Sequence, residues 1–240
     1  MNEIDNFSLM TFDRAIQTLK KWKIIPFKSF YLVSSDTHKK TYSYKYLARL
    51  INAGIATKMK LPQTNACVVL PSKRIIEDFN IPLTKEQFTH DTVVSYVASA
   101  FMTLPHFKDS EFIFEHESGK FHLGSVIPDL EIKGVDPKSF DEFHFAIEIE
   151  LSRKAFSKID DKLRKYAQDR TFDHVVYFFT SEDLYQLFKK RISTWEEGGS
   201  KILSGKISLV FVTDYLSLHE KMMDLKCFSN GSEGILRDFF

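Results

Sequence analysis

Five short apolar segments in the second half of the chain alternate with helical patterns, and this alternation most constrains the fold. Each segment is rich in Val, Ile and Phe, as is typical of strands in a buried sheet. The predicted strands span residues 111–115, 125–133, 143–151, 174–179 and 207–212. Helical periodicity occurs over residues 154–167 and 181–192. The sequence therefore predicts an α/β or α+β domain with a mixed sheet flanked by helices.

The first third of the chain predicts a separate unit of three helices and a hairpin. Apolar residues recur at spacings of three and four over residues 10–23, and further helices fit residues 27–33 and 36–53. Two strands, IATKMK and ACVVL, flank a turn that contains Pro, Gln and Asn. Three helices followed by a hairpin are the order of elements in a winged helix.

These patterns divide the chain into four parts. The helix-breaking Pro82 lies between the two main parts. The predicted parts are a winged helix at 1–71, a connector at 72–85, a sheet domain at 86–220 and a C-terminal tail at 221–240.

Charge is unevenly distributed, although the formal net charge of the 240 residues is only +1. Residues 1–63 carry 11 basic and 4 acidic side chains, a net charge of +7, and the rest of the chain carries 22 and 28, a net charge of −6. A basic segment of this kind suits DNA phosphates, although lysines are also common on any solvated helix face. The candidate DNA-binding residues, on the third helix and the wing, are Lys39, Lys40, Lys45, Arg49, Lys58 and Lys60.

Three acidic residues lie on two successive predicted strands. Asp129 follows Pro128, and Glu148 and Glu150 alternate with isoleucines in the next strand. Because side chains alternate along a strand, the two glutamates share a face. Buried carboxylates need a counter-charge, and hard ions such as Mg²⁺ and Mn²⁺ take oxygen ligands. The three acids are therefore candidate metal ligands at a site that activates water against a phosphodiester.

Simpler interpretations of the same residues stay open. Asp129 could cap a turn, and the two glutamates could lie on an exposed face and pair with Lys133. Other catalytic signatures are missing from the sequence, which has no Walker A, GxGxxG or GxSxG pattern and no histidine pair flanking one residue. The two cysteines lie far apart and the N-terminus carries acids, so we expect a cytoplasmic protein without membrane insertion.

The order of a Pro-Asp strand, a Glu-x-Glu strand and a lysine-rich helix resembles the PD-(D/E)xK nuclease superfamily, which has the restriction-endonuclease fold. Glu150 stands where the general pattern has Lys, as it does in some restriction enzymes. Lys154, Lys158 or Lys162 could then supply the positive charge. With Thr-His-Asp at 89–91, IPDLEI and FAIEIELSRKAFSKIDDKLRKYAQ, the chain is similar to the replication-relaxation family, which includes MobC-type relaxases of mobilisable plasmids.

This resemblance implies a function and a set of site residues. Asp129, Glu148 and Glu150 match the metal and catalytic carboxylates, Lys162 and Tyr166 match residues of the following helix, and His90 matches a family histidine. The implied activity is a Mg²⁺- or Mn²⁺-dependent nick in one DNA strand at a plasmid origin of transfer during conjugative mobilisation, with water or a tyrosine as the attacking group. Accessory mobilisation or coupling proteins are the implied partners.

Two other functions remain as alternatives. One is a plasmid replication or transcription regulator that binds DNA without catalysis, in which a nuclease-like domain supports dimers or partner contacts. The other is a restriction-type endonuclease that breaks both strands of foreign DNA. Packing alone could also explain Tyr166, and a helix-terminus or core position could explain His90.

Overall fold

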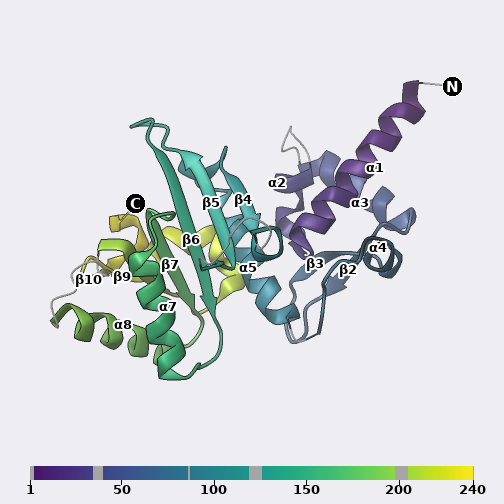
Figure 1. Ribbon diagram of the computed structural model, residues 1–240. Helices are drawn as coiled ribbons and strands as arrows, with labels where there is room; N and C mark the ends of the chain where they lie inside the picture. The colour runs from purple at the N-terminus through teal and green to yellow at the C-terminus, as the bar shows by residue number, and fades with distance from the viewer. Residues whose placement is uncertain (1–2, 35–39, 86, 119–125, 198–204, 240) are drawn as a thin grey trace. The chain divides into compact units, whose positions relative to one another are not determined.

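A computed structural model shows the expected mixed α/β class and two compact units, Met1–Ser99 and Ala100–Phe240 (Figure 1). Each unit has its own sheet, of three strands in the first and seven in the second. The structure describes residues 3–34, 40–85, 87–118, 126–197 and 205–239. Among the described helices, none is long and apolar enough to cross a membrane.

The N-terminal unit places helices around a small antiparallel sheet in the order β1-β3-β2. The helices at 3–22, 30–34 and 40–52 and the strands at 56–60 and 67–71 lie close to the positions that the sequence predicts, whereas the two-residue strand at 25–26 is not predicted. The elements of this unit are α1 (Glu3–Trp22), β1 (Ile25–Pro26), the 3-10 turn η1 (Phe27–Ser29), α2 (Phe30–Ser34), α3 (Lys40–Asn52), β2 (Ala56–Lys60), β3 (Cys67–Pro71), α4 (Lys73–Phe79) and α5 (Phe88–Phe101). Leu19, Trp22, Leu50, Val68 and Val69 form part of its buried core.

The segment that the sequence predicts as a connector contains helix α4. Ser72 caps this helix by accepting a hydrogen bond from the Ile75 amide at 3.4 Å, and Asn80 ends it in the left-handed conformation at φ 54°. The two units divide at Ser99, within α5, rather than at the predicted connector. A helix of seven residues is too short to show a clear apolar period, so the sequence pattern misses it.

The C-terminal unit is built on a seven-stranded mixed sheet in the order β10-β9-β8-β7-β6-β5-β4. Strands β6, β7 and β8 are parallel, and the other neighbours are antiparallel. The strands are β4 (Glu111–Phe114), β5 (Leu130–Val135), β6 (Glu142–Glu150), β7 (His174–Phe179), β8 (Ile207–Phe211), β9 (Lys226–Ser229) and β10 (Ser232–Ile235). The helical segments are η2 (Pro105–Phe107), α6 (Glu115–Ser118), α7 (Phe156–Gln168), α8 (Glu182–Glu197), η3 (Tyr215–Ser217), α10 (Leu218–Lys221), η4 (Met222–Asp224) and η5 (Leu236–Phe239).

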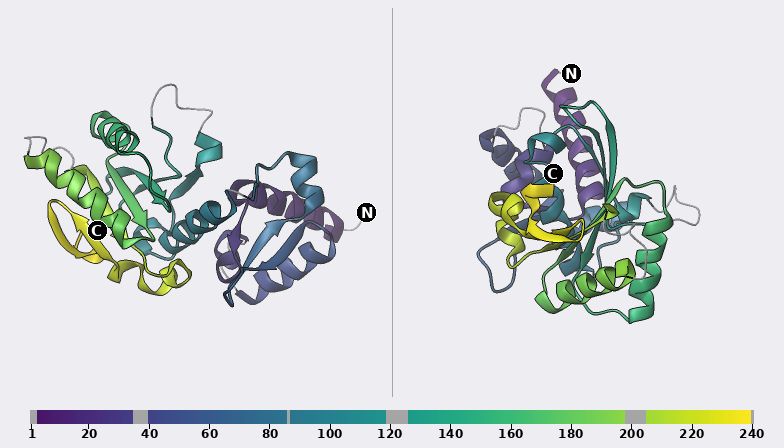
Figure 2. Two further views of the ribbon diagram at one scale, coloured as in Figure 1. Left: turned by 90° about the horizontal axis from the view of Figure 1, so that it is seen from below. Right: turned by 90° about the vertical axis from the view of Figure 1, so that its left-hand side faces the viewer.

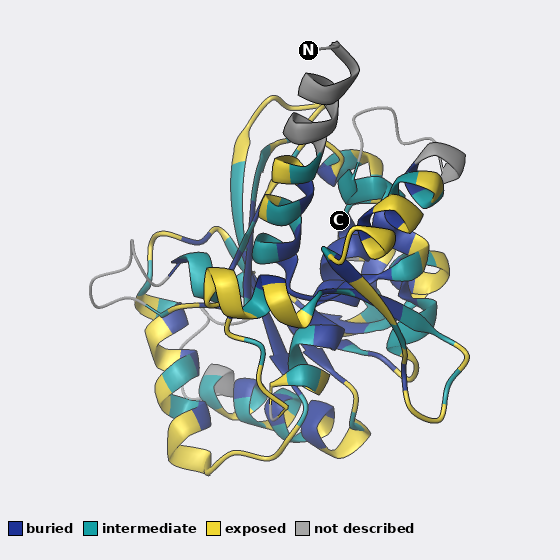
Figure 3. Cartoon of the chain, turned by 90° about the vertical axis from the view of Figure 1, so that its right-hand side faces the viewer, coloured by how far each residue is buried: buried dark blue, intermediate teal, exposed yellow. Residues whose placement is uncertain are grey.

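Helices cover one face of this sheet, and aromatic side chains cover the other. Helices α7 and α8 connect the parallel strands and pack on one face, where Ala146, Tyr177 and Leu209 contribute to a shared apolar cluster (Figure 1). On the opposite face the Phe107 ring lies 5.9 Å from the Phe145 ring, centroid to centroid. The central strands are largely buried and the outer helix faces are exposed (Figure 3). Both faces of the second half of β6, residues 146–150, are therefore buried.

Residues 221–240, predicted as a tail, extend the sheet. Strands β9 and β10 form an antiparallel hairpin, and β9 pairs with β8 (Figure 2, yellow). Each strand has only four residues, and β10 is half-buried or exposed, so alternation gives little signal there.

Candidate functional site

The register of β5 and β6 brings Asp129 to the two glutamates. Leu130 pairs with Ile147, so Asp129, one residue before β5, lies at the level of Glu148. The Asp129 Oδ2 accepts a hydrogen bond from the Ile149 amide at 2.6 Å. The backbone of β6 therefore fixes the Asp129 carboxylate beside the Glu-x-Glu pair.

Glu148 and Glu150 lie on the buried face of β6. Their exposed fractions are 0% and 2%, and Glu148 pairs across the ladder with Tyr177, a member of the cluster under α7 and α8. The alternative of a solvent-exposed strand face is therefore wrong. Lys133 instead forms an ion pair with another acid, Glu131, with its Nζ 3.6 Å from Oε2.

Helix α7 supplies two hydrogen-bond donors to Glu148. Its apolar face is set by Ile159, Leu163 and Tyr166, which are all buried. Lys162 precedes Tyr166 by one helical turn, so both side chains leave the helix on the same side. The Lys162 ammonium donates to Glu148 Oε2, and the Tyr166 hydroxyl donates to Glu148 Oε1. Both carboxylate oxygens of Glu148 are thus hydrogen-bonded from one helix.

Glu150 pairs with lysines on the segment that follows β6. The Lys154 Nζ donates to Glu150 Oε1 at 2.8 Å, and the Lys162 Nζ lies 3.9 Å from the same oxygen. Lys162 therefore stands between the two glutamates. Lys158, the third lysine considered from the sequence, is exposed.

Burial dominates the electrostatics of this cluster. Burial, followed by the negative charge of Asp129, raises the pKa of Glu148 to about 8. Burial opposes the charge of Lys162, but Glu148, Asp129 and Glu150 together raise its pKa. Burial and the neighbouring Glu148 hold the pKa of Tyr166 well above its usual value. At Glu148, burial and the Asp129 charge thus outweigh the opposing effects of Lys162 and Tyr166.

The donor set fits a hard divalent cation. Mg²⁺ is commonly held by one or two carboxylates and otherwise keeps water or substrate oxygens, which matches Asp129 and Glu148. Among the described residues, no group of three or more His, Cys, Asp or Glu side chains is arranged to hold a metal by itself.

The other predicted site residues lie in the N-terminal unit. His90 is on α5, with Nδ1 3.8 Å from Asp91 Oδ1. The exposed candidates for DNA contact are Lys45 and Arg49 on α3 and Lys58 and Lys60 on β2. Lys58 also lies over the Phe27 ring, 3.8 Å from its centroid. Lys39 and the side chain of Lys40 lie outside the described residues.

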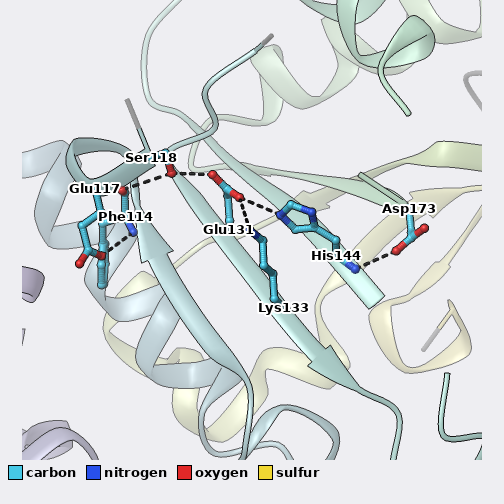
Figure 4. Close-up of polar contacts among 7 residues, drawn as sticks. All are labelled: Phe114, Glu117, Ser118, Glu131, Lys133, His144 and Asp173. Carbon is cyan, nitrogen blue, oxygen red and sulfur yellow. Dashed lines mark hydrogen bonds and ion pairs between the residues drawn. The ribbon is translucent and has the colours of Figure 1, made fainter. Parts of the chain in front are cut away.

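A second polar cluster on the same sheet face has no counterpart in the sequence-based prediction. Glu131 is fully buried and contacts Ser118, Lys133 and His144 (Figure 4). The sequence does contain a signal for Glu131, because a residue two positions after Asp129 on a strand faces the same way as Asp129. His144 and Ser118 carry no comparable signal, since they come from segments distant in sequence.

Comparison with known protein families, curated proteins and solved structures finds no match to this chain. The contacts around Glu148 therefore carry the functional assignment.

Proposed function

We propose that this protein is a divalent-metal-dependent DNA endonuclease of the relaxase type, which nicks one strand at a plasmid origin of transfer during conjugative mobilisation. The observation that carries the proposal is the pairing of Asp129 and Glu148 on adjacent strands, with Lys162 bound to Glu148. Paired carboxylates with an adjacent lysine suit phosphodiester hydrolysis, since the chemistry needs both a cation site and positive charge near the phosphate.

The architecture supports the same proposal. The N-terminal unit has the helix and hairpin order of a winged helix, and the mixed sheet with its carboxylates on β5 and β6 is consistent with a restriction-endonuclease-like fold. The exposed basic residues of α3 and β2 would contact phosphates, while the C-terminal unit would hold the reacting bond. Accessory mobilisation or coupling proteins are the partners that we propose for it during mobilisation.

Each residue of the cluster has a distinct role in the proposed reaction. Asp129 and Glu148 would hold Mg²⁺ or Mn²⁺, which lowers the pKa of a bound water and neutralises charge that develops on the phosphate. Lys162 places a positive charge beside both glutamates. We assign Glu150, which accepts a hydrogen bond from Lys154, to accept a proton from the attacking water.

The position of Tyr166 favours water as the attacking group. Its side chain is fully buried, and its hydroxyl donates to Glu148. A nucleophile must reach the phosphorus atom, and the raised pKa of this tyrosine also disfavours the phenolate. We therefore assign Tyr166 to orienting Glu148 rather than to a covalent DNA adduct.

A plasmid relaxation assay tests the proposal. Supercoiled plasmid that carries the protein's own origin is incubated with protein and Mg²⁺ or Mn²⁺, and a chelator serves as control. Wild type is expected to produce open circles, and the double variant Asp129→Asn, Glu148→Gln is expected to be slower by at least about a hundredfold. Glu142→Gln, an exposed acid on the same strand, is the matched control and should nick like wild type.

The other outcomes of this assay would overturn the proposal. Equal relaxation by wild type and the double variant would remove the carboxylates from the chemistry. Linear products without an origin requirement would indicate a restriction-type endonuclease. Tight DNA binding without cleavage under any metal condition would indicate the non-catalytic regulator.

A further inference from the structure

Glu131 is a buried carboxylate that the proposed reaction does not use. Its Oε1 accepts a hydrogen bond from the Ser118 hydroxyl at 2.5 Å, and its Oε2 lies 2.7 Å from the His144 Nε2 (Figure 4). Lys133 adds a longer ion pair at 3.6 Å. A carboxylate removed from water is retained at a cost unless its partners are well placed, so this arrangement fixes the His144 ring.

His144 in turn holds the segment that follows α7. Its backbone amide donates to Asp173 Oδ2 at 2.8 Å, and the Asp173 amide donates to the His144 carbonyl at 2.9 Å. The imidazole ring packs against Phe172 with the ring centroids 4.6 Å apart. Both the main chain and the ring of His144 therefore set the position of Phe172.

Phe172 connects this cluster to the candidate site. Its side chain is 2% exposed and meets the Tyr166 ring edge-on, with the centroids 6.0 Å apart. The Tyr166 hydroxyl donates to Glu148. A continuous series of contacts thus runs from Glu131 through the rings of His144, Phe172 and Tyr166 to the carboxylate that the proposed reaction depends on.

We infer that Glu131 and His144 are positioning residues that hold Tyr166 against Glu148 through Phe172. The inference rests on the proposed function for its catalytic meaning, but the contact it describes is independent of catalysis. Removal of a side chain from a close-packed core leaves space into which its neighbours partly relax, so the loss of a supporting ring lets the next ring shift. Loss of His144 should therefore release the Tyr166 hydroxyl from Glu148.

Proton NMR of the full chain tests this contact directly. A buried tyrosine hydroxyl that donates to a carboxylate exchanges slowly and gives a downfield signal, which Tyr166→Phe assigns by its loss. We expect His144→Ala and Phe172→Leu to abolish this signal or move it upfield. The matched control is His174→Ala, which removes a partly buried histidine of the next strand, hydrogen-bonded to Ser208 instead. It should leave the signal unchanged.

The outcomes separate this inference from a general structural role. Folding of each variant is followed by circular dichroism, and if His144→Ala does not fold, Phe172→Leu decides. An unshifted hydroxyl signal in a folded Phe172→Leu or His144→Ala variant would overturn the inference, whatever its melting temperature. A control variant that loses the signal would do the same.

Nicking kinetics add the functional readout. His144→Ala should lower kcat to the level of Tyr166→Phe with KM unchanged, and the two changes together should cost no more than either alone. Additive losses would show that His144 does not act through Tyr166. If wild type shows the hydroxyl signal but no nicking, the proposed function fails while the positioning contact stands.

Discussion

At the scale of single residues, Glu148 accepts two hydrogen bonds from α7 and has no exposed surface. Hydrogen bonds to a charged group contribute more than neutral ones, and an unpaired buried carboxylate is costly. Removal of either donor should therefore destabilise the fold. The contribution of the Tyr166 hydroxyl can be measured separately, because the same core contains a tyrosine whose hydroxyl lies in a different environment.

Tyr166→Phe removes one donor to Glu148 at nearly constant volume. Above pH 8, where Glu148 is charged because its pKa is about 8, we expect a loss of about 1.5–3 kcal/mol in unfolding free energy, the range for a hydrogen bond to a charged group. Urea denaturation measures it. Tyr185→Phe is the control, because the Tyr185 hydroxyl is buried without a hydrogen-bond partner among the described residues, and this variant should be neutral or more stable. Equal losses in the two variants would contradict the assigned contact.

The same substitution distinguishes the two attacking groups. If water attacks, Tyr166→Phe still nicks DNA, with activity reduced by about tenfold through the loss of one hydrogen bond. If the tyrosine attacked, the variant would be inactive and wild type would leave a covalent protein–DNA adduct. Gel analysis of the reaction products under denaturing conditions measures both the nicked DNA and the covalent adduct.

His174 predicts a dependence of stability on pH. Burial, followed by the charge of Lys206, lowers the pKa of His174 from 6.5 to about 4. The unfolded chain therefore binds a proton between pH 6.5 and 4 that the folded chain does not, so stability is lost as the pH falls through this window. The loss amounts to at most about 3 kcal/mol, since one pKa unit corresponds to about 1.4 kcal/mol.

Thermal unfolding of His174→Gln across pH 4–7 measures this contribution. The difference in stability between wild type and variant should change across the window, in favour of the variant at low pH. A difference that is constant with pH would show that His174 titrates normally in the folded protein.

At the scale of elements, the β5–β6 pair is the part of the fold that sets the site. Gly134 on β5 faces Phe143 on β6, and a Cβ at Gly134 would lie 2.5 Å from Ser110 Oγ and 2.6 Å from Phe143 Cζ. The Phe143 ring is itself packed against Phe107. The Ser110 and Phe143 side chains thus occupy the space that a side chain at residue 134 would need.

Gly134→Ala should destabilise the protein by about 1–3 kcal/mol, because the added methyl group overfills a packed region. Chemical denaturation measures the change. Gly205→Ala is the matched control, since a Cβ there meets nothing within 4 Å, and it should be neutral or slightly stabilising. A neutral Gly134→Ala would mean that the Ser110 and Phe143 side chains do not fill this space.

Strong periodicity allowed much of the fold to be predicted from sequence. The FHFAIEIEL run, predicted as a strand, forms β6. The helix predicted at 154–167 forms α7, with Ile159, Leu163 and Tyr166 on its buried face. Alternation also placed Glu148 and Glu150 on one face, although it could not show that this face is buried. The contacts of Glu131 with Ser118 and His144 depend on strand order and register, which a local pattern does not contain.

At the scale of the whole molecule, charge follows the division into units. The N-terminal unit carries 14 basic and 8 acidic residues, a net charge of +6, and the C-terminal unit carries 19 and 24, a net charge of −5. A net charge near zero thus combines a basic unit suited to phosphates with an acidic unit that contains the candidate cation site. DNA affinity should accordingly depend on the basic unit.

The salt dependence of DNA binding tests this division. Each lost phosphate contact lowers the slope of log affinity against log salt by about 0.9, so Lys45→Ala, Arg49→Ala should lower it by about 2. Fluorescence anisotropy with origin DNA measures the slope. Lys138→Ala, an exposed lysine of the C-terminal unit, should leave it unchanged. An unchanged slope in the double variant would exclude α3 from the DNA interface.

The central claim is that Asp129 and Glu148 hold a divalent cation, and anomalous diffraction from crystals soaked in Mn²⁺ tests it most directly. The account predicts an anomalous peak about 2 Å from a carboxylate oxygen of each residue. The peak should be absent from crystals of the Asp129→Asn, Glu148→Gln variant. If Mn²⁺-soaked wild-type crystals show no peak and Lys162 still bridges Glu148 and Glu150, Asp129 and Glu148 do not hold a divalent cation.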